Sequence, residues 1–384
     1  MPTPRPASPA CGDGWCARPE LPEPGAGRGV CSVGDSPARF PVSAVHWPLA
    51  TAVASRLAGR YPLEGSYHFA MLSRQAPELV RRAAELASAE TRLPWTGEPR
   101  VEVVTRAEWC RANVAAFGRL LAPAEAKLAA SGAGLGRRLA GRVMGAEVGA
   151  LVGVLARRVL GQYELVVPTG DGSGDTVMLV GGNLLAMERQ HEFRPAEFRL
   201  WVALHECTHR LQFTAVPWVG PHFLGLVARL IESSAGEPGR ASRLAGEMRA
   251  AAREGRPIVD ETGVMGLLAT PEQRRLIDEA QALMSVLEGH GHVVMDRIGA
   301  RLLVGQDRMA RVLKARRRDA RFSVFFRLTG LEMKMKQYEQ GERFMLAVER
   351  QGGFGAIDRV WEGPQNLPTL GEIRDPSRWL ERVA

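Results

Sequence analysis

The stretch HECTHRLQF, residues 205–213, decides how the rest of this chain is interpreted. It contains the pattern HExxH, in which His205 and His209 stand four residues apart and Glu206 follows the first histidine. On an α-helix, residues four apart are offset by only about 40° around the axis, so both imidazoles can reach one metal ion. Glu206 can then act on a metal-bound water as general base. The spacing therefore predicts two metal ligands and a proton acceptor, as in zinc-dependent hydrolases.

The residues around the motif predict a buried helix over about 196–213. Pro195 stands where a first helical turn tolerates proline, and no glycine or proline follows until Pro217. Apolar side chains leave little of this helix polar, as in a helix buried on most sides. Two histidines and a glutamate are costly to bury without partners, and a metal ion would satisfy them. The alternative is a pair of core histidines that hydrogen-bond to backbone carbonyls.

The chain has 384 residues, a formal net charge of +8 and a sequence pI of about 9.7. That length can bury a sizeable core in one large domain or two smaller ones. The basic excess is scattered, apart from the run KARRR at 314–318, which is typical of a solvated helix face or loop. The composition therefore does not favour nucleic-acid binding.

The first 42 residues are rich in Pro, Gly and small residues and show little periodicity, which predicts disorder. They also lack the apolar core of a signal peptide. The longest apolar stretch, residues 145–156, is too short to span a bilayer. We therefore expect a disordered segment at 1–42, one catalytic domain at 43–384, a cytoplasmic location and no membrane partner.

Helical patterns dominate the rest of the chain, and a capping box at Thr105 and Glu108 marks one helix start. The other expected elements are a strand at 101–104 and helices at 47–60, 77–88, 123–130 and 138–159. The main β signal, at 163–167 and 176–180, flanks the turn-prone run 170–174 and predicts a hairpin or two edge strands. The second strand is a candidate to pair with an extended substrate, and a plain hairpin that covers the core is the alternative.

A catalytic zinc ion normally has three protein ligands, so one more is expected outside the motif. A histidine six residues after His209 is excluded, because Ala215 stands there. The better candidate is Glu288, in a helix expected over about 271–301 behind the capping box TPEQ at 270–273. A free carboxylate is costly among its apolar neighbours, although a core salt bridge is the alternative. Outside candidates for the metal are His222 and Glu232.

His292 and Asp296 follow Glu288 at four-residue steps, so the three side chains project along one stripe. Either could orient a ligand imidazole, and His292 could equally be a ligand or merely structural. Gly289 and Gly291 would each weaken a helix by roughly 1 kcal/mol relative to alanine. We therefore expect another backbone to pack closely there, with the helix at 196–213 as the candidate.

Five passages of the chain resemble one protein family. They are RVLGQYELVVP (158–168), EFRLWVALHECTHRLQF (197–213), LMSVLEGHGHVVMD (283–296), GLEMKMKQYEQGERF (330–344) and LPTLGEIRDPSRWLERV (367–383). The chain from about Trp47 to its end resembles the actinobacterial zincin-like hydrolase, or zinc-dependent metalloprotease, family. The resemblance is greatest to the branch associated with deazaflavin-coenzyme biosynthesis genes.

This resemblance implies a mainly α, zincin-like (glutamate-zincin) fold with a small β element and a Zn²⁺ cofactor. Carried over by motif, His205 and His209 are metal ligands, Glu206 is the base and Glu288 completes the metal site. In glutamate-zincins the residue four positions after the ligand glutamate is often an acid that bonds the first histidine. Here that residue is His292 and not an acid, so the resemblance does not identify the group that orients the ligand histidine.

Tyr338, in the passage QYEQG, is a candidate to donate a hydrogen bond to a developing oxyanion, a role that zincins fill with Tyr or His. Arg343 could act in the same way. The alternative is a helix packed by Met333, Met335 and Phe344, with Tyr338 in the core.

The expected function is therefore a zinc metallohydrolase, foremost a peptidase, in which Glu206 activates a zinc-bound water. Its partner would be a peptide or a small amide substrate. One alternative is a catalytically silent, zincin-like binding or regulatory protein, and another is a hydrolase of a small amide or ester. An open groove along 176–180 would favour peptides, whereas a closed pocket would favour a small substrate.

Overall fold

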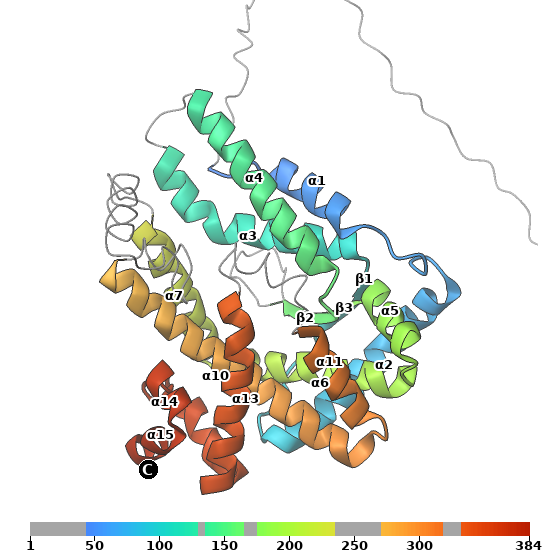
Figure 1. Cartoon of the computed structure of the whole chain (residues 1–384), viewed down its shortest axis with the longest axis vertical. Coiled ribbons are helices and arrows are strands. Elements are labelled where there is room, and N and C mark those ends of the chain that lie inside the picture. The colour runs from blue at the N-terminus through green and yellow to red at the C-terminus, as the bar shows by residue number, and fades with distance from the viewer. Residues whose placement is uncertain (1–43, 130–134, 165–174, 235–269, 318–331) are drawn as a thin grey trace, which may run out of the picture. The chain divides into compact units, whose positions relative to one another are not determined.

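The computed structural model describes residues 44–129, 135–164, 175–234, 270–317 and 332–384 (Figure 1). Residues Val42–Ala384 belong to one compact unit. Its described part is mainly helical with one small sheet, which confirms the fold class expected from the sequence.

The described residues up to Ser234 form the sheet and seven of the described helices. They are α1 (Trp47–Ala58), α2 (Tyr67–Thr91), β1 (Arg100–Val104), α3 (Arg106–Ala129), α4 (Leu135–Ala156), β2 (Gly161–Glu164), β3 (Thr176–Val180), α5 (Gly181–His191), α6 (Pro195–Thr214) and α7 (Val219–Ser234). The rest of the chain, from residue 270 on, is helical where it is described. Its elements are α10 (Pro271–Leu302), α11 (Gln306–Arg317), α13 (Glu332–Gly352), η1 (Phe354–Glu362), η2 (Pro364–Asn366), α14 (Leu370–Arg374) and α15 (Pro376–Val383).

The sheet has the strand order β1–β3–β2, with β3 parallel to β1 and antiparallel to β2. The predicted pairing of the segments 163–167 and 176–180 is confirmed by the pairing of β2 with β3. Residues 165–174 lie outside the described part. However, β3 is the central strand and is buried along its whole length. The prediction that β3 pairs with an extended substrate is therefore wrong, because two neighbouring strands already share its backbone groups.

Alternation along β3 divides its side chains between two layers of helices. Val177 and Leu179 pack into a core with α2 and α6, whereas Met178 and Val180 pack with α1, α3 and α4. The strand β2 contacts α6 beside this first core. The sheet therefore packs against α6, the helix that carries the HExxH motif.

Two helices begin earlier than the prolines at which they were expected to start. Pro77 and Pro123 lie inside α2 and α3, so the starts predicted at these positions are wrong. The side chain of Ser66 caps α2, and the predicted capping box of Thr105 and Glu108 is present just before α3. A strong upstream cap starts the helix, and each proline then costs one backbone hydrogen bond further along.

The packing of α4 on α1 depends on Gly145, Gly149 and Gly153 (Figure 1). A Cβ at these positions would lie 2.4–2.7 Å from carbonyl oxygens of α1 or of its cap, so only glycine allows this approach. Arg138–Ala156 of α4 is long and apolar enough to cross a membrane. Core helices of soluble proteins meet the same length and composition criteria.

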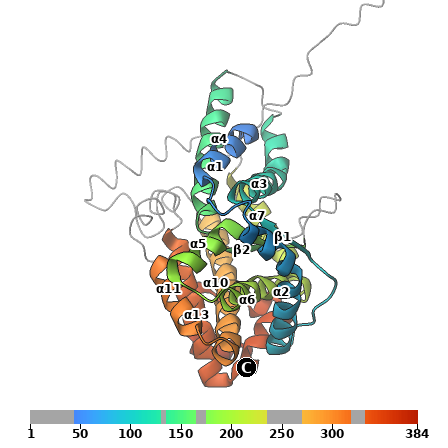
Figure 2. The same cartoon turned by 90° about the vertical axis from the view of Figure 1, so that its right-hand side faces the viewer.

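The helices α10 and α13 lie side by side and cross at glycines (Figures 1 and 2). A Cβ on Gly289 would lie 2.3 Å from the carbonyl carbon of Gly341, and one on Gly341 would lie 1.9 Å from the Ser285 oxygen. The close neighbour predicted for Gly289 is therefore α13 and not α6. Gly291 does face α6, where its missing Cβ would lie 3.1 Å from the ring of His205.

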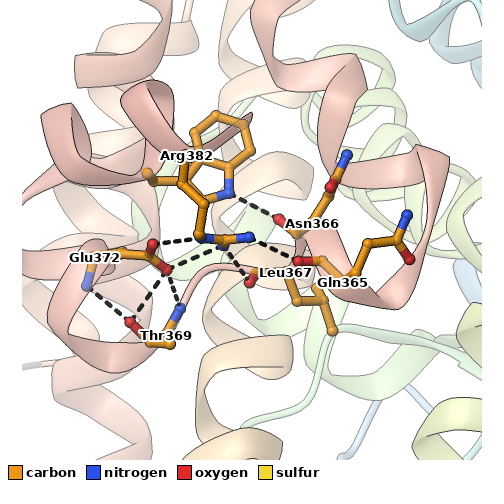
Figure 3. Close-up of polar contacts among 7 residues, drawn as sticks. Gln365, Asn366, Leu367, Thr369, Glu372 and Arg382 are labelled. Atoms are coloured by element: carbon orange, nitrogen blue, oxygen red, sulfur yellow. Dashed lines mark hydrogen bonds and ion pairs between the residues drawn. The ribbon is translucent and has the colours of Figure 1, made fainter. Parts of the chain in front are cut away.

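Arg382 fastens the C-terminal helix α15 to the segment before α14 (Figure 3). Its guanidinium donates to the Glu372 carboxylate at 2.6 and 3.1 Å and to the backbone oxygens of Gln365 and Leu367 at 2.7 and 2.9 Å. Burial opposes the ionisation of Glu372, but the hydrogen bonds from Arg382 and Thr369 outweigh it and hold the pKa of this carboxyl below its usual value. The cluster closes the end of the core that contains α13 and part of α10.

We predict that Gly341→Ala lowers the free energy of unfolding by about 1–3 kcal/mol, the usual range for overpacking a tight core. The added methyl group would meet the Ser285 carbonyl, so the two helix backbones would have to separate. Urea denaturation followed by circular dichroism measures the change. Gly225→Ala on α7 is the control, because no atom lies within 4 Å of the added Cβ. Equal effects of the two substitutions would contradict the close crossing.

Candidate metal centre

Three side chains from two helices bring their ligand atoms together. His205 and His209 come from α6, and their Nε2 atoms are 3.1 Å apart. The Oε2 atom of Glu288, on α10, lies 3.5 Å from the first nitrogen and 3.6 Å from the second. In the described part of the chain, no other group of histidine, cysteine or acidic side chains could hold a metal ion in this way.

The spacing of these atoms fits a tetrahedral zinc ion. Zinc–ligand bonds of about 2.0–2.1 Å place the ligand atoms of a tetrahedron about 3.3 Å apart. The three observed separations lie between 3.1 and 3.6 Å. Two imidazole nitrogens and one carboxylate oxygen are also a donor set of catalytic zinc sites, which leave the fourth position to water. The residues therefore fit the ion that the motif predicts.

Gln212 fixes the ring of His209. Its Oε1 lies 2.9 Å from His209 Nδ1, and its Nε2 donates to the Leu287 carbonyl at 2.9 Å and to His290 Nδ1 at 3.0 Å. Because an amide oxygen can only accept, Nδ1 of His209 carries a proton and its Nε2 is turned toward the ligand group. Sequence reasoning missed Gln212, although an amide three residues after a ligand on the same helix was a usable signal.

The charges of the centre set its protonation when no metal is bound. Burial favours a neutral ring at His209, but the Glu288 carboxylate outweighs burial and raises the pKa of His209 to about 9. Burial also opposes the ionisation of Glu288, yet the two histidines hold its pKa well below the usual value. Burial and the charge of His209 lower the pKa of His290 to about 3, so this ring stays neutral. A metal ion must therefore displace a proton from His209.

Glu206 lies against β2 beside the ligand group. A Cβ on Gly161 would lie 2.7 Å from Cγ of Glu206, so glycine leaves room for this side chain. The backbone N–H of Tyr163 donates to the carboxylate. Burial raises the pKa of Glu206 and outweighs the opposing charges of His205 and His209. A carboxyl group that takes up a proton readily is suited to accept one and return it.

His292 and Asp296 have different surroundings. The ring of His292 packs on that of His205, with centroids 4.9 Å apart and an angle of 35° between the planes. Asp296 accepts a hydrogen bond of 3.0 Å from Gln306, close to the turn into α11. Orientation of a ligand imidazole by either residue stays a prediction. Cys207, between the two ligand histidines in sequence, faces the core, with Sγ 3.6 Å from a carbonyl oxygen of α2.

The other candidates lie outside the ligand group. Tyr338 belongs to α13, but its side chain lies outside the described part, so its proposed role as an oxyanion donor stays a prediction. Arg343 is exposed and donates to the Glu339 carbonyl on its own helix at 2.9 Å. His222 and Glu232 belong to α7 and do not join the ligand group.

The sequence and the fold match known proteins. The zincin-like metallopeptidase family matches residues 45–380. The chain belongs to this family. A crystal structure from Chloroflexus aurantiacus, described as a "putative hydrolase with a novel fold", is 32% identical with a TM-score of 0.64. The alignment covers 88% of this chain and 98% of that one. No curated protein matches the sequence.

The family match confirms the zincin-like fold and the resemblance at the level of the family. It identifies the chain as a metallopeptidase-like hydrolase, and its group of two histidines and a glutamate is compatible with the ion that such proteins hold.

We predict that Gln212→Leu weakens zinc binding about 10- to 100-fold, the usual effect of removing the partner of a ligand histidine. The ring of His209 would lose the acceptor that holds its tautomer and orientation. Competition with a chromophoric chelator measures the affinity. Gln351→Leu, at an exposed position on α13, is the matched control and should leave zinc affinity unchanged. An unchanged affinity in Gln212→Leu would rule out this role.

We also predict that zinc binding at pH 7 releases about one proton per ion, because a coordinating imidazole must be neutral. His209 is protonated below its pKa of about 9 in the metal-free protein, so zinc affinity should rise with pH and level off near that value. Calorimetric titrations in buffers of different ionisation enthalpy count the protons. Binding without proton release at pH 7 would contradict the assignment.

Proposed function

We propose that this protein is a zinc-dependent peptidase in which Glu206 is the general base. The observation that carries the proposal is the convergence of His205, His209 and Glu288, with the carboxyl group of Glu206 buried beside them. Membership of the zincin-like metallopeptidase family supports the same reaction class.

The residues of the centre divide the chemistry between them. His205, His209 and Glu288 would hold the ion, which supplies Lewis acidity toward a water molecule and a carbonyl group. Glu206 takes a proton from the attacking water and returns it to the leaving amine. Its burial favours the protonated form between these two transfers. The hydrogen bond from the Tyr163 amide favours the ionised form of the carboxyl group and so opposes the effect of burial.

The edge of β2 supports a peptide-like substrate. Val180 N–H donates to the Leu160 carbonyl, so the alternate residues Gly161 and Tyr163 turn their backbone groups away from β3. One of these groups, the Tyr163 amide, binds Glu206, and the others follow the edge to which an extended peptide can add. A chain bound there would run beside the base. This assigns to β2 the role that the sequence had suggested for β3.

The cytoplasmic location and the absence of membrane and nucleic-acid partners are parts of this proposal that rest on the sequence. So does the link to the actinobacterial branch associated with deazaflavin-coenzyme biosynthesis genes. That link rests on the resemblance of the five sequence passages together.

We predict that Glu206→Gln keeps its zinc but lowers kcat about 100- to 10,000-fold, the usual contribution of a general base. Turnover of a fluorescence-quenched peptide library and elemental analysis for zinc are the two measurements. Glu288→Ala should lose most of its zinc, whereas Glu232→Gln, an exposed acid on α7, should change neither quantity. Undiminished hydrolysis by Glu206→Gln would defeat the assignment of the base.

A further inference from the structure

Four arginines from separate parts of the chain lie together just before β2. Arg106 begins α3, Arg157 and Arg158 follow α4, and Arg316 lies near the end of α11. A guanidinium nitrogen of Arg316 donates to the Arg157 carbonyl at 3.3 Å, and one of Arg158 donates to the Arg316 carbonyl at 3.2 Å. These two bonds hold α11 against the connection between α4 and β2.

Asn183 ties Arg106 to the same connection. Arg106 Nε donates to Asn183 Oδ1 at 2.7 Å, and the Asn183 amide nitrogen donates to the carbonyls of Ala156 and Val159 at 2.8 and 2.6 Å. Asn183 is 1% exposed, so these bonds are shielded from water. The guanidinium of Arg106 is thereby held next to residues 157 and 158.

Three arginines of this cluster lack an acidic partner in the part of the chain that the structure describes. Within the described ranges, Arg106, Arg157 and Arg316 form no ion pair with a carboxylate, and Glu64 acts on Arg106 only from a distance. Burial, together with the charges of Arg158 and Arg106, lowers the pKa of Arg316 to about 10. Charges of one sign are costly to hold together in a partly buried place unless an opposite charge joins them.

Within the run at 314–318, predicted to be a solvated helix face or loop, Lys314 is exposed as predicted but Arg316 is not, and residue 318 lies outside the described part. Arg316 is half-buried and turns toward the connection before β2, whereas Lys314 and Arg311 on the same helix are exposed. The positive charge of Arg316 also acts on His191. Burial, together with the charges of Arg316 and Arg308, lowers the pKa of this histidine.

We propose that this arginine cluster binds a phosphate group of a small molecule. Guanidinium groups present paired N–H donors that match the oxygens of a phosphate, and they keep their charge when partly buried. A phosphate carries about 1.5–2 negative charges at pH 7, so it balances several guanidinium groups better than a single carboxylate does. The cluster shares no residue with the hydrolytic centre, and the proposal does not depend on the reaction proposed there.

Calorimetric titration of the full-length protein with inorganic phosphate at physiological ionic strength tests the proposal. We expect one saturable site, and we expect Arg316→Gln to weaken it by about tenfold or more, as for loss of a charge-assisted bidentate contact. Arg311→Gln, on the same helix, is the matched control and should leave the Kd unchanged. Arg157→Gln changes an exposed side chain while keeping its backbone carbonyl, so it should weaken binding without disturbing the fold.

Phosphate should also raise the Tm of the wild type and of Arg311→Gln more than that of Arg157→Gln or Arg316→Gln. Absence of saturable phosphate binding to the wild type would overturn the proposal. So would equal affinities of the wild type, Arg157→Gln and Arg316→Gln. Binding of acetate as tight as that of phosphate would overturn the preference for phosphate.

Discussion

The close approach of α10 to two helices at once is the constraint on which the candidate centre depends. Gly289 admits the backbone of α13 on one side, and Gly291 admits the ring of His205 on the other. Glu288 directly precedes Gly289, so the packing at these two glycines places its carboxylate in the ligand group. The same helix contributes to two apolar cores, one with α6 and one with α13. A shift of α10 would therefore disturb both cores together with the ligand group.

The helix α6 also holds the candidate centre in place, because its polar side chains bind the segment before β3 on one side and α10 on the other. Arg210, next to the ligand His209, binds the Asp175 carboxylate at 2.6 and 2.8 Å and lies over the ring of Trp95 at 4.2 Å. Asp175 directly precedes β3, so this ion pair fastens the sheet to the metal-binding helix. Gln212 binds α10 in the other direction. One helix thus aligns the base, the ligands and the strand beside them.

Local periodicity explains which parts could be predicted from the sequence. The four-residue spacing of His205 and His209, the isolated Glu288 and the capping box before α10 depend only on neighbours along one helix, and the structure contains each of them in the expected place. Strand order depends on contacts distant in sequence, so the central position of β3 could not be read from its residues. The role of Gln212 depends on a side-chain direction across two helices. The helix start predicted at Pro77 was wrong because the upstream cap, Ser66, determines where α2 begins.

The Glu288 carboxylate lies 3.6 Å from His209 Nε2, outweighs the effect of burial and raises the pKa of His209 to about 9. The attraction between the protonated imidazole and the carboxylate stabilises the close arrangement of side chains that an ion would also hold. The ligands need little rearrangement when an ion arrives or departs, since no like charges are left to repel each other. Metal binding at neutral pH is therefore an exchange of the His209 proton for the ion.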